Sequence, residues 1–95
     1  MDELALERAT DIFRALANPL RVGIVRELAQ GERAVHELVE ALEVSQPLVS
    51  QHLAVLRGVR LVARHRAGRH VTYHLVDHHV AHIVEDAVTH AVEVA

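Results

Sequence analysis

The sequence predicts a small, mostly α-helical protein with one β-hairpin, and three observations carry that prediction. The chain has 95 residues, which suits one domain with a limited core. Its hydrophobic fraction is 51%, but it contains one Phe, one Tyr and no Trp, so Leu, Val, Ile and Ala must build the core. Hydrophobic side chains recur at helical spacing along most of the chain and change pattern only over residues 61–75.

Five helices are expected from this spacing and from the residues that favour helix ends. The expected helices cover residues 3–17, 19–30, 35–42, 46 to 57 or 58, and 77–93. Asn18 and Ser45 are typical capping residues for the second and fourth helices, and each is followed by a proline in the first turn. Gly31 is expected to end the second helix, and Asp77 to cap the last one.

Residues 61–75 have the composition of a β-hairpin. Residues 61–63 and 71–75 are expected to form two strands. Between them, residues 64–70 form an arginine-rich tip with its turn at Ala67-Gly68.

The predicted order of elements is that of a winged helix-turn-helix in a single domain spanning residues 1–95. The helix-turn-helix lies at about residues 35–57, the wing at about 61–75 and a final helix at about 77–93. The apolar stripe of that final helix is broad and lies at the chain end, so we expect a partner helix to cover it. The predicted fold is therefore dimeric through its terminal helices.

Basic residues concentrate in one segment although the net charge is −3. From Val44 to Val76 the chain has no Asp or Glu, and this segment holds Arg57, Arg60, Arg64, Arg66 and Arg69. A local positive field matters more than net charge for binding phosphates, so the segment indicates a DNA-binding surface. The alternative is a solvated basic face without a partner.

The second helix of the helix-turn-helix presents small or hydrogen-bonding side chains, which suit base edges and phosphates in the major groove. The arginines of the wing suit phosphates or a minor groove. The predicted DNA-binding residues are Ser45, Gln46, Ser50, Gln51, His52, Arg64, Arg66 and Arg69. The alternative is a helical hairpin of an unrelated bundle, and the adjoining acid-free hairpin favours DNA binding over it.

Histidine is abundant, with nine in the chain, and the last helix carries a pattern typical of a metal site. His90 and Glu93 are three residues apart and share one side of a helix. His79 precedes His90 by eleven residues, which is about 16 Å along the axis. Because metal–ligand distances are about 2 Å, one ion cannot touch both ends of one helix. Two antiparallel helices of a dimer would instead bring Asp77 and His79 of one chain beside His90 and Glu93 of the other.

Two imidazoles and two carboxylates in a tetrahedral shell suit zinc, with cobalt or nickel as further candidates. His74, His78 and His82 are possible additional ligands. For each residue alone there is a structural alternative: Asp77 as a helix cap, and His90 with Glu93 as a surface hydrogen bond.

Other classes of protein are excluded by what the sequence lacks. The chain has no cysteine, which excludes disulfides and thiolate metal sites. It has no signal peptide and no apolar run of roughly 20 residues, so a cytoplasmic protein is expected. It has no nucleophile–base set or phosphate loop, and a closed four-ligand site leaves no open position for chemistry, so we expect neither an enzyme nor a small organic substrate.

The sequence resembles the ArsR/SmtB family of metal-sensing repressors over nearly its whole length. The resemblance is carried by residues 16–21, residues 45–53 with Leu56-Arg57, residues 66–70 with Tyr73, and residues 77–80. The last helix is similar to the family's fifth-helix zinc site at Asp77, His79, His90 and Glu93.

The resemblance implies a homodimeric repressor that binds an imperfect palindrome in its target promoter. Metal binding would lower the DNA affinity and switch on a gene for metal efflux or sequestration. The resemblance also implies that His90 hydrogen-bonds the backbone near Arg60, which would couple the metal site to the DNA-reading unit.

The sequence departs from the family pattern in three places. Residues 33–38 lack the Cys-x-Cys site of many relatives, which argues against sensing of arsenite, cadmium or lead. Gln51-His52 replaces the common Ser-His pair of the recognition helix. No His-rich tail follows Glu93, and this third departure favours zinc over nickel or cobalt. Two alternatives stay open: a nickel or cobalt sensor of the same fold, and a metal-blind winged-helix DNA-binding regulator.

Overall fold

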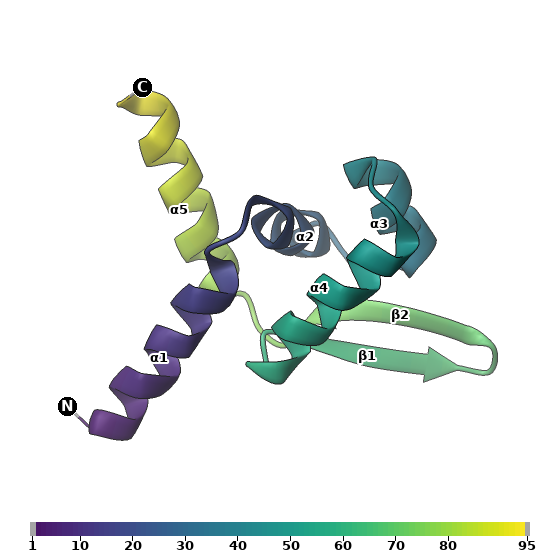
Figure 1. The fold of residues 1–95 in the computed structure, drawn as a ribbon, viewed down its shortest axis with the longest axis horizontal. Coiled ribbons are helices and arrows are strands. Elements are labelled where there is room, and N and C mark those ends of the chain that lie inside the picture. Colours follow the sequence, from purple (N-terminus) through teal and green to yellow (C-terminus); the bar gives the residue numbers. More distant parts are fainter. Residues whose placement is uncertain (1, 95) are drawn as a thin grey trace.

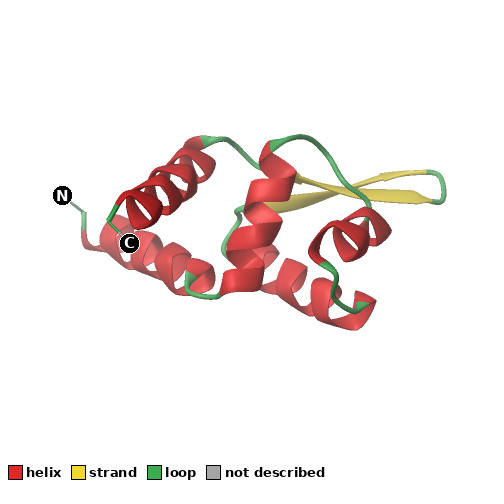
Figure 2. Ribbon diagram, turned by 90° about the horizontal axis from the view of Figure 1, so that it is seen from above, coloured by secondary structure: helices red, strands yellow, loops and turns green. Residues whose placement is uncertain are grey.

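The computed structural model describes residues 2–94 as five helices and a two-stranded antiparallel hairpin. The elements are α1 (Glu3–Leu16), α2 (Pro19–Ala29), α3 (Val35–Leu42), α4 (Gln46–Gly58), β1 (Val62–Ala67), β2 (His70–Leu75) and α5 (His79–Glu93). In Figures 1 and 2 the hairpin extends to one side of the molecule, and α1 and α5 lie together on the opposite side. The predicted mostly α-helical fold with one hairpin is confirmed.

Side-chain caps set the start of the helices that form the DNA-reading unit. Asn18 Oδ1 accepts the backbone N–H groups of Leu20 and Arg21 at 2.9 and 3.1 Å, and Ser45 Oγ accepts that of Leu48 at 3.4 Å. Glu43 ends α3 in the left-handed region, with φ of 56°. This conformation lets the chain turn from α3 into α4 within three residues.

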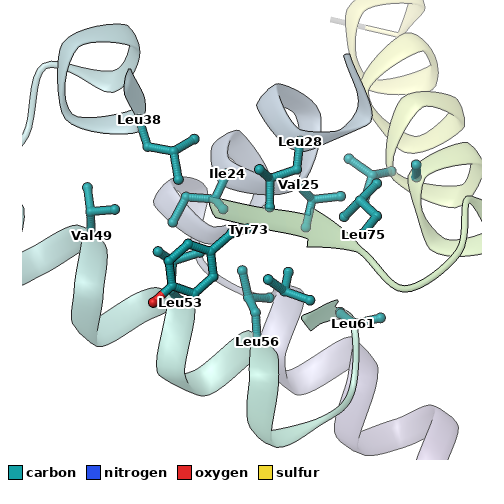
Figure 3. Close-up of a cluster of buried hydrophobic side chains, with 13 residues drawn as sticks. Ile24, Val25, Leu28, Leu38, Val49, Leu53, Leu56, Leu61, Tyr73 and Leu75 are labelled. Carbon is teal, nitrogen blue, oxygen red and sulfur yellow. The ribbon is translucent and has the colours of Figure 1, made fainter. Parts of the chain in front are cut away.

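The core lies where α2, α3, α4 and the hairpin meet (Figure 3). Its largest fully buried side chains come from the three helices: Ile24, Val25, Leu38, Val49, Leu53 and Leu56. Tyr73 of β2 covers this cluster. The same residue exchanges two backbone hydrogen bonds with Arg33, which lies just before α3, at 2.7 and 3.0 Å. The base of the wing is therefore fastened to the helix-turn-helix through both side chain and backbone.

The strands of the wing are longer than the sequence pattern indicates, and its expected turn is wrong by one residue. Ala67 pairs with His70, so the turn consists of Gly68 and Arg69. Gly68 has φ of 63°, and a glycine with positive φ at the first turn position is typical of a type II′ hairpin. Arg64 and Arg66, which were expected in the tip, continue β1 because backbone pairing does not require apolar side chains.

The start of α5 also differs from the expectation. Its capping residue is His78, whose side chain makes no capping hydrogen bond, so Asp77 is not the cap. Asp77 Oδ1 nevertheless accepts the backbone N–H of His79 at 3.0 Å. The carboxylate therefore supports the first turn from outside the helix, as Asp residues do when they bond the backbone two residues on.

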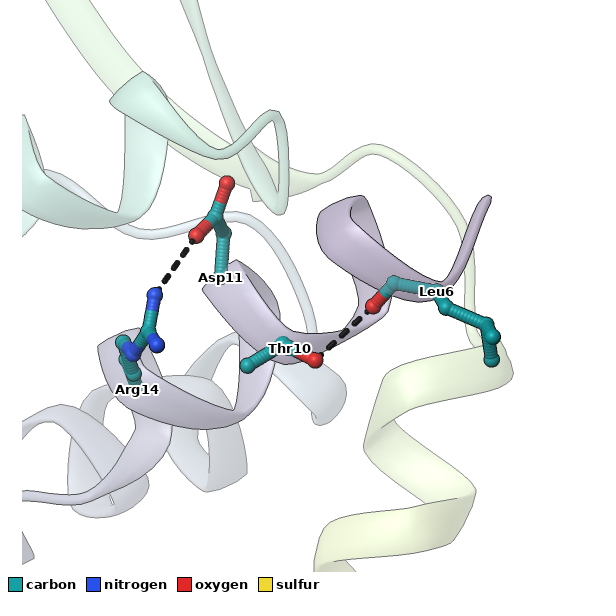
Figure 4. Close-up of polar contacts among 4 residues, drawn as sticks. All are labelled: Leu6, Thr10, Asp11 and Arg14. Atoms are coloured by element: carbon teal, nitrogen blue, oxygen red, sulfur yellow. Dashed lines mark hydrogen bonds and ion pairs between the residues drawn. The ribbon is translucent and has the colours of Figure 1, made fainter. Parts of the chain in front are cut away.

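The outer faces of α1 and α5 are apolar and open. An apolar groove between the two helices is lined by Phe13, Leu16, Ala17, Val22, Ile83, Val84, Ala87, Val88 and Ala91. Phe13 is 57% exposed and Ile83 is 47% exposed. Two side-chain contacts on α1 stay within that helix: Thr10 Oγ1 donates to the Leu6 carbonyl, and Arg14 donates to Asp11 (Figure 4). Nothing among residues 2–94 covers the groove. Separately, no helix in this range is long and apolar enough to cross a bilayer.

Candidate functional site

One face of α4 is free to contact a ligand because the opposite face builds the core. Val49, Leu53 and Leu56 are buried, whereas the predicted DNA-binding residues Ser45, Gln46, Ser50 and Gln51 are exposed. Ser45 has the additional task of capping the helix. The recognition helix therefore begins with an exposed polar turn held in place by its own cap.

His52 occupies a different environment from the other predicted DNA-binding residues of α4. It is half-buried, and its Nδ1 lies 3.0 Å from Nη1 of Arg21 on α2. Burial lowers the pKa of His52, and the positive charge of Arg21 lowers it further. The folded structure thus favours the neutral imidazole.

Arg21 is a residue that the sequence analysis did not assign to the site. Its Nε donates a hydrogen bond to the carbonyl of Ala15 at the end of α1, while Nη1 donates to His52. Arg21 and His52 are 31 positions apart in the sequence, so no local pattern could have paired them. The nearest signal is the placement of Arg21 in the first turn after the Asn18 cap.

The arginines of the wing are exposed, as a phosphate-binding surface requires. Arg64 and Arg66 lie two positions apart on β1 and therefore share one face of the hairpin. Arg66 Nε donates to the carbonyl of Gly68 at 3.1 Å, which orders the tip. Arg69 lies in the turn itself.

The four predicted metal ligands are exposed and lie at the two ends of α5. Asp77 and His79 flank the first turn, and His90 and Glu93 lie in the last. Within residues 2–94 of one chain, no three His, Asp or Glu side chains come together as a metal site. Of the possible additional ligands, His78 and His82 lie near the first pair, whereas His74 Nδ1 is 3.9 Å from Glu32.

The entry to α5 is attached directly to the exit of the recognition helix. The N–H of Val76 donates to the carbonyl of Leu61 at 3.0 Å. Leu61 follows Arg60, which leaves α4 in the left-handed region with φ of 60°. The C-terminal end of α5 lies well away from the end of α4 of the same chain (Figure 1).

A second attachment joins the middle of α5 to α2. Arg26 Nε lies 2.7 Å from Glu85 Oε1, and Glu85 raises the pKa of Arg26 through this hydrogen bond and its charge. Because α2 also packs against α3 and α4, it connects α5 with the helix-turn-helix.

Comparison with known proteins identifies the family of the chain. The family model described as "Bacterial regulatory protein, arsR family" matches residues 18–64. The HTH-type transcriptional regulator NmtR of Mycobacterium tuberculosis is 38% identical over 91 residues, which cover 96% of this chain and 76% of NmtR. The chain belongs to the arsR family of bacterial regulatory proteins.

Two other proteins also resemble this chain over most of its length. The HTH-type transcriptional repressor SmtB of M. tuberculosis is 56% identical over 88 residues, which is 93% of this chain. The chain spans 65% of the length of that repressor. A homodimeric winged helix-turn-helix DNA-binding domain, Mb0332 from Mycobacterium bovis, superposes with a TM-score of 0.85 at 29% identity, over 98% of this chain and 89% of that one. These relatives are regulators, which agrees with the prediction that the arsR-family chain is not an enzyme, and the likeness to Mb0332 confirms the winged helix-turn-helix.

The lowered pKa of His52 predicts how stability depends on pH. The neutral ring stabilises the fold fully above the unfolded pKa of about 6.5, and this contribution is lost as pH falls through the lower native pKa. Between about pH 8 and pH 5, the wild type should therefore lose more free energy of unfolding than the His52→Asn variant. Urea denaturation at matched protein concentration measures the difference, and equal losses would show that His52 is not held neutral.

Proposed function

We propose that the chain is a homodimeric repressor that binds double-stranded operator DNA and releases it when zinc binds between the two α5 helices. Release would derepress genes for metal efflux or sequestration. The observation that carries the proposal is the joint placement of two features: an exposed recognition helix with an arginine wing, and metal-ligating residues at both ends of the helix attached to them.

The DNA-binding half of the proposal rests on shape and charge. The first two turns of α4 have Gln46, Ser50 and Gln51 exposed, where base edges and phosphates of a major groove would lie. Arg64, Arg66 and Arg69 extend the same acid-free segment along the wing, where they would grip flanking phosphates. The names of the relatives SmtB and NmtR, a transcriptional repressor and regulator, support this assignment.

The proposal of a dimer is based on the apolar groove between α1 and α5. Burying exposed apolar area contributes about 25 cal/mol per Å², so side chains such as Phe13 and Ile83 favour association. A second copy that lays its own α1 and α5 against this groove would cover it symmetrically. The homodimeric state of Mb0332 supports this arrangement.

The proposal of a metal site is based on the chemistry of the ligand side chains and on their spacing. One carboxylate oxygen of Asp77 accepts the N–H of His79, and the other oxygen is left to bind a metal ion. In an antiparallel pair of α5 helices, His90 and Glu93 of the partner subunit would complete the set. When bound, zinc would supply a closed four-coordinate link between the subunits. The resemblance of these positions to the fifth-helix zinc site of the ArsR/SmtB family supports zinc.

The proposed coupling between metal binding and DNA binding follows from the position of Asp77 next to a residue that is bonded to the end of the recognition helix. Asp77 follows Val76, whose N–H is bonded to the residue after Arg60, so a pull on Asp77 acts at the end of the recognition helix. An antiparallel partner would also bring its His90 to this end, and the second ring nitrogen would then be free to bond the backbone near Arg60. Metal binding and DNA binding would in this way favour different positions of α4.

The proposed wing–phosphate interaction predicts a change in salt dependence. Replacing Arg66 with Ala should weaken binding to a duplex selected by the wild type from a randomised pool. It should also make the slope of log affinity against log salt shallower, by about 0.9 for each DNA phosphate that the variant no longer neutralises. Arg8→Ala, which removes an equal charge from α1, is the matched control and should keep the wild-type slope. An unchanged slope in Arg66→Ala would show that the wing does not contact phosphate.

The proposed metal switch predicts that one variant keeps its affinity for DNA but no longer responds to zinc. His90→Ala should bind the selected duplex as the wild type does without metal, because His90 is not among the residues proposed to contact DNA. It should not lose affinity on adding zinc, whereas the wild type should lose about 5- to 150-fold. Fluorescence anisotropy of the labelled duplex measures both, and His36→Ala on α3 controls for removal of an exposed histidine. Release of His90→Ala by zinc at wild-type concentrations would contradict the mechanism.

A further inference from the structure

Arg21 joins three helices that the DNA-reading unit needs in register. Its backbone N–H is held by the Asn18 cap at the start of α2, at 3.1 Å. Its Nε donates to the Ala15 carbonyl at the end of α1, and its Nη1 lies 3.0 Å from Nδ1 of His52 in the middle of α4. Backbone and side chain of Arg21 are thus both fixed before the contact with His52 is made.

This contact decides which nitrogen of the His52 ring carries hydrogen. A guanidinium group only donates hydrogen bonds and stays charged at all relevant pH values. Nδ1 must therefore be the acceptor, and in a neutral ring the hydrogen must lie on Nε2. Protonating Nδ1 would set a donor and a second positive charge against Arg21, which agrees with the lowered pKa of His52.

We propose that Arg21 is a positioning residue for DNA binding: it holds His52 as the tautomer with hydrogen on Nε2, which leaves an N–H available to a DNA phosphate. The inference rests on the proposed DNA-binding function. His52 directly follows the exposed residues Ser50 and Gln51 on α4 and is itself half-buried, so part of the residue is accessible at the surface. A phosphate oxygen accepts hydrogen bonds, so an Nε2–H attracts it and an Nε2 lone pair repels it.

The tautomer can be measured without DNA. Long-range ¹H–¹⁵N spectra of the folded wild type at about pH 8, where the neutral ring dominates, distinguish the two tautomers by the shifts of the ring nitrogens. We expect protonated Nε2 and unprotonated Nδ1 for His52. Arg21→Lys keeps the charge, but its single nitrogen cannot occupy the separate positions from which Nε and Nη1 donate to Ala15 and His52, so it should shift this tautomer balance. Arg26→Lys on the same helix, which pairs with Glu85, should not.

The role in DNA binding is tested with a random-sequence duplex at low salt, because phosphate contacts do not need the operator. Arg21→Lys should weaken binding by about ten- to hundredfold, as expected for one charge-assisted hydrogen bond, and Arg26→Lys should not. In a His52→Ala background, the Arg21→Lys change should cost no further affinity. If it costs as much there as in the wild type, Arg21 acts independently of His52 and the inference is wrong.

A second pair of variants keeps the inference testable if Arg21→Lys fails to fold. The amide of Gln can place an N–H near the position of Nε2, whereas the shorter Asn reaches only the position of Nδ1. His52→Gln should therefore retain more DNA affinity than His52→Asn. Equal affinities, or a wild-type ring with hydrogen on Nδ1, would overturn the inference. Failure of the proposed function looks different, because the wild type itself would then bind no duplex while the His52 tautomer remained as expected.

Discussion

The length of α5 is the constraint on which the rest of this structure depends. Eleven residues of helix separate His79 from His90 by about 16 Å, whereas metal–ligand bonds are about 2 Å long. Ligand sets placed at the two ends of a rigid helix can cooperate only if a second helix runs antiparallel to the first. The same helix presents the apolar residues Ile83 and Ala87 to a groove shared with α1, so the surface that would bring two subunits together also sets their ligands opposite each other.

The second feature of the fold is how directly α5 is joined to the elements that would contact DNA. The hydrogen bond from Val76 to Leu61 connects its start to the end of α4, and the Arg26–Glu85 ion pair connects its middle to α2. Arg21 makes a comparable connection between α1 and α4. Both helices that line the open groove are thus attached to the recognition helix by specific polar contacts, and a rearrangement of the dimer would be transmitted to it over short distances.

Local chemistry explains which parts of this structure could be predicted from the sequence. Asn18 and Ser45 are strong caps, so the starts of α2 and α4 are as expected. The turn of the wing was misplaced by one residue because either Ala67-Gly68 or Gly68-Arg69 supplies a glycine, and only strand register decides between them. The start of α5 was misplaced because an Asp two residues before a helix can bond the same N–H groups as a true cap. Arg21 was missed because its partners come from α1 and α4, and a tertiary contact across 31 positions leaves no local pattern. The four proposed metal ligands could be chosen from their spacing, because that spacing would allow them to meet only across two chains.

The central claim, a metal site shared between antiparallel α5 helices, is tested most directly by complementation between two defective chains. One variant lacks the first ligand pair through Asp77→Ala and His79→Ala, and the other lacks the second through His90→Ala and Glu93→Ala. Each variant alone should bind no zinc at the site. After unfolding and refolding the two together, the mixed dimer has one complete site, made of Asp77 and His79 from one chain and His90 and Glu93 from the other. Equilibrium dialysis of the purified mixed dimer should therefore find one tightly bound zinc ion. A mixed dimer that binds no more zinc than its parents would contradict the shared site.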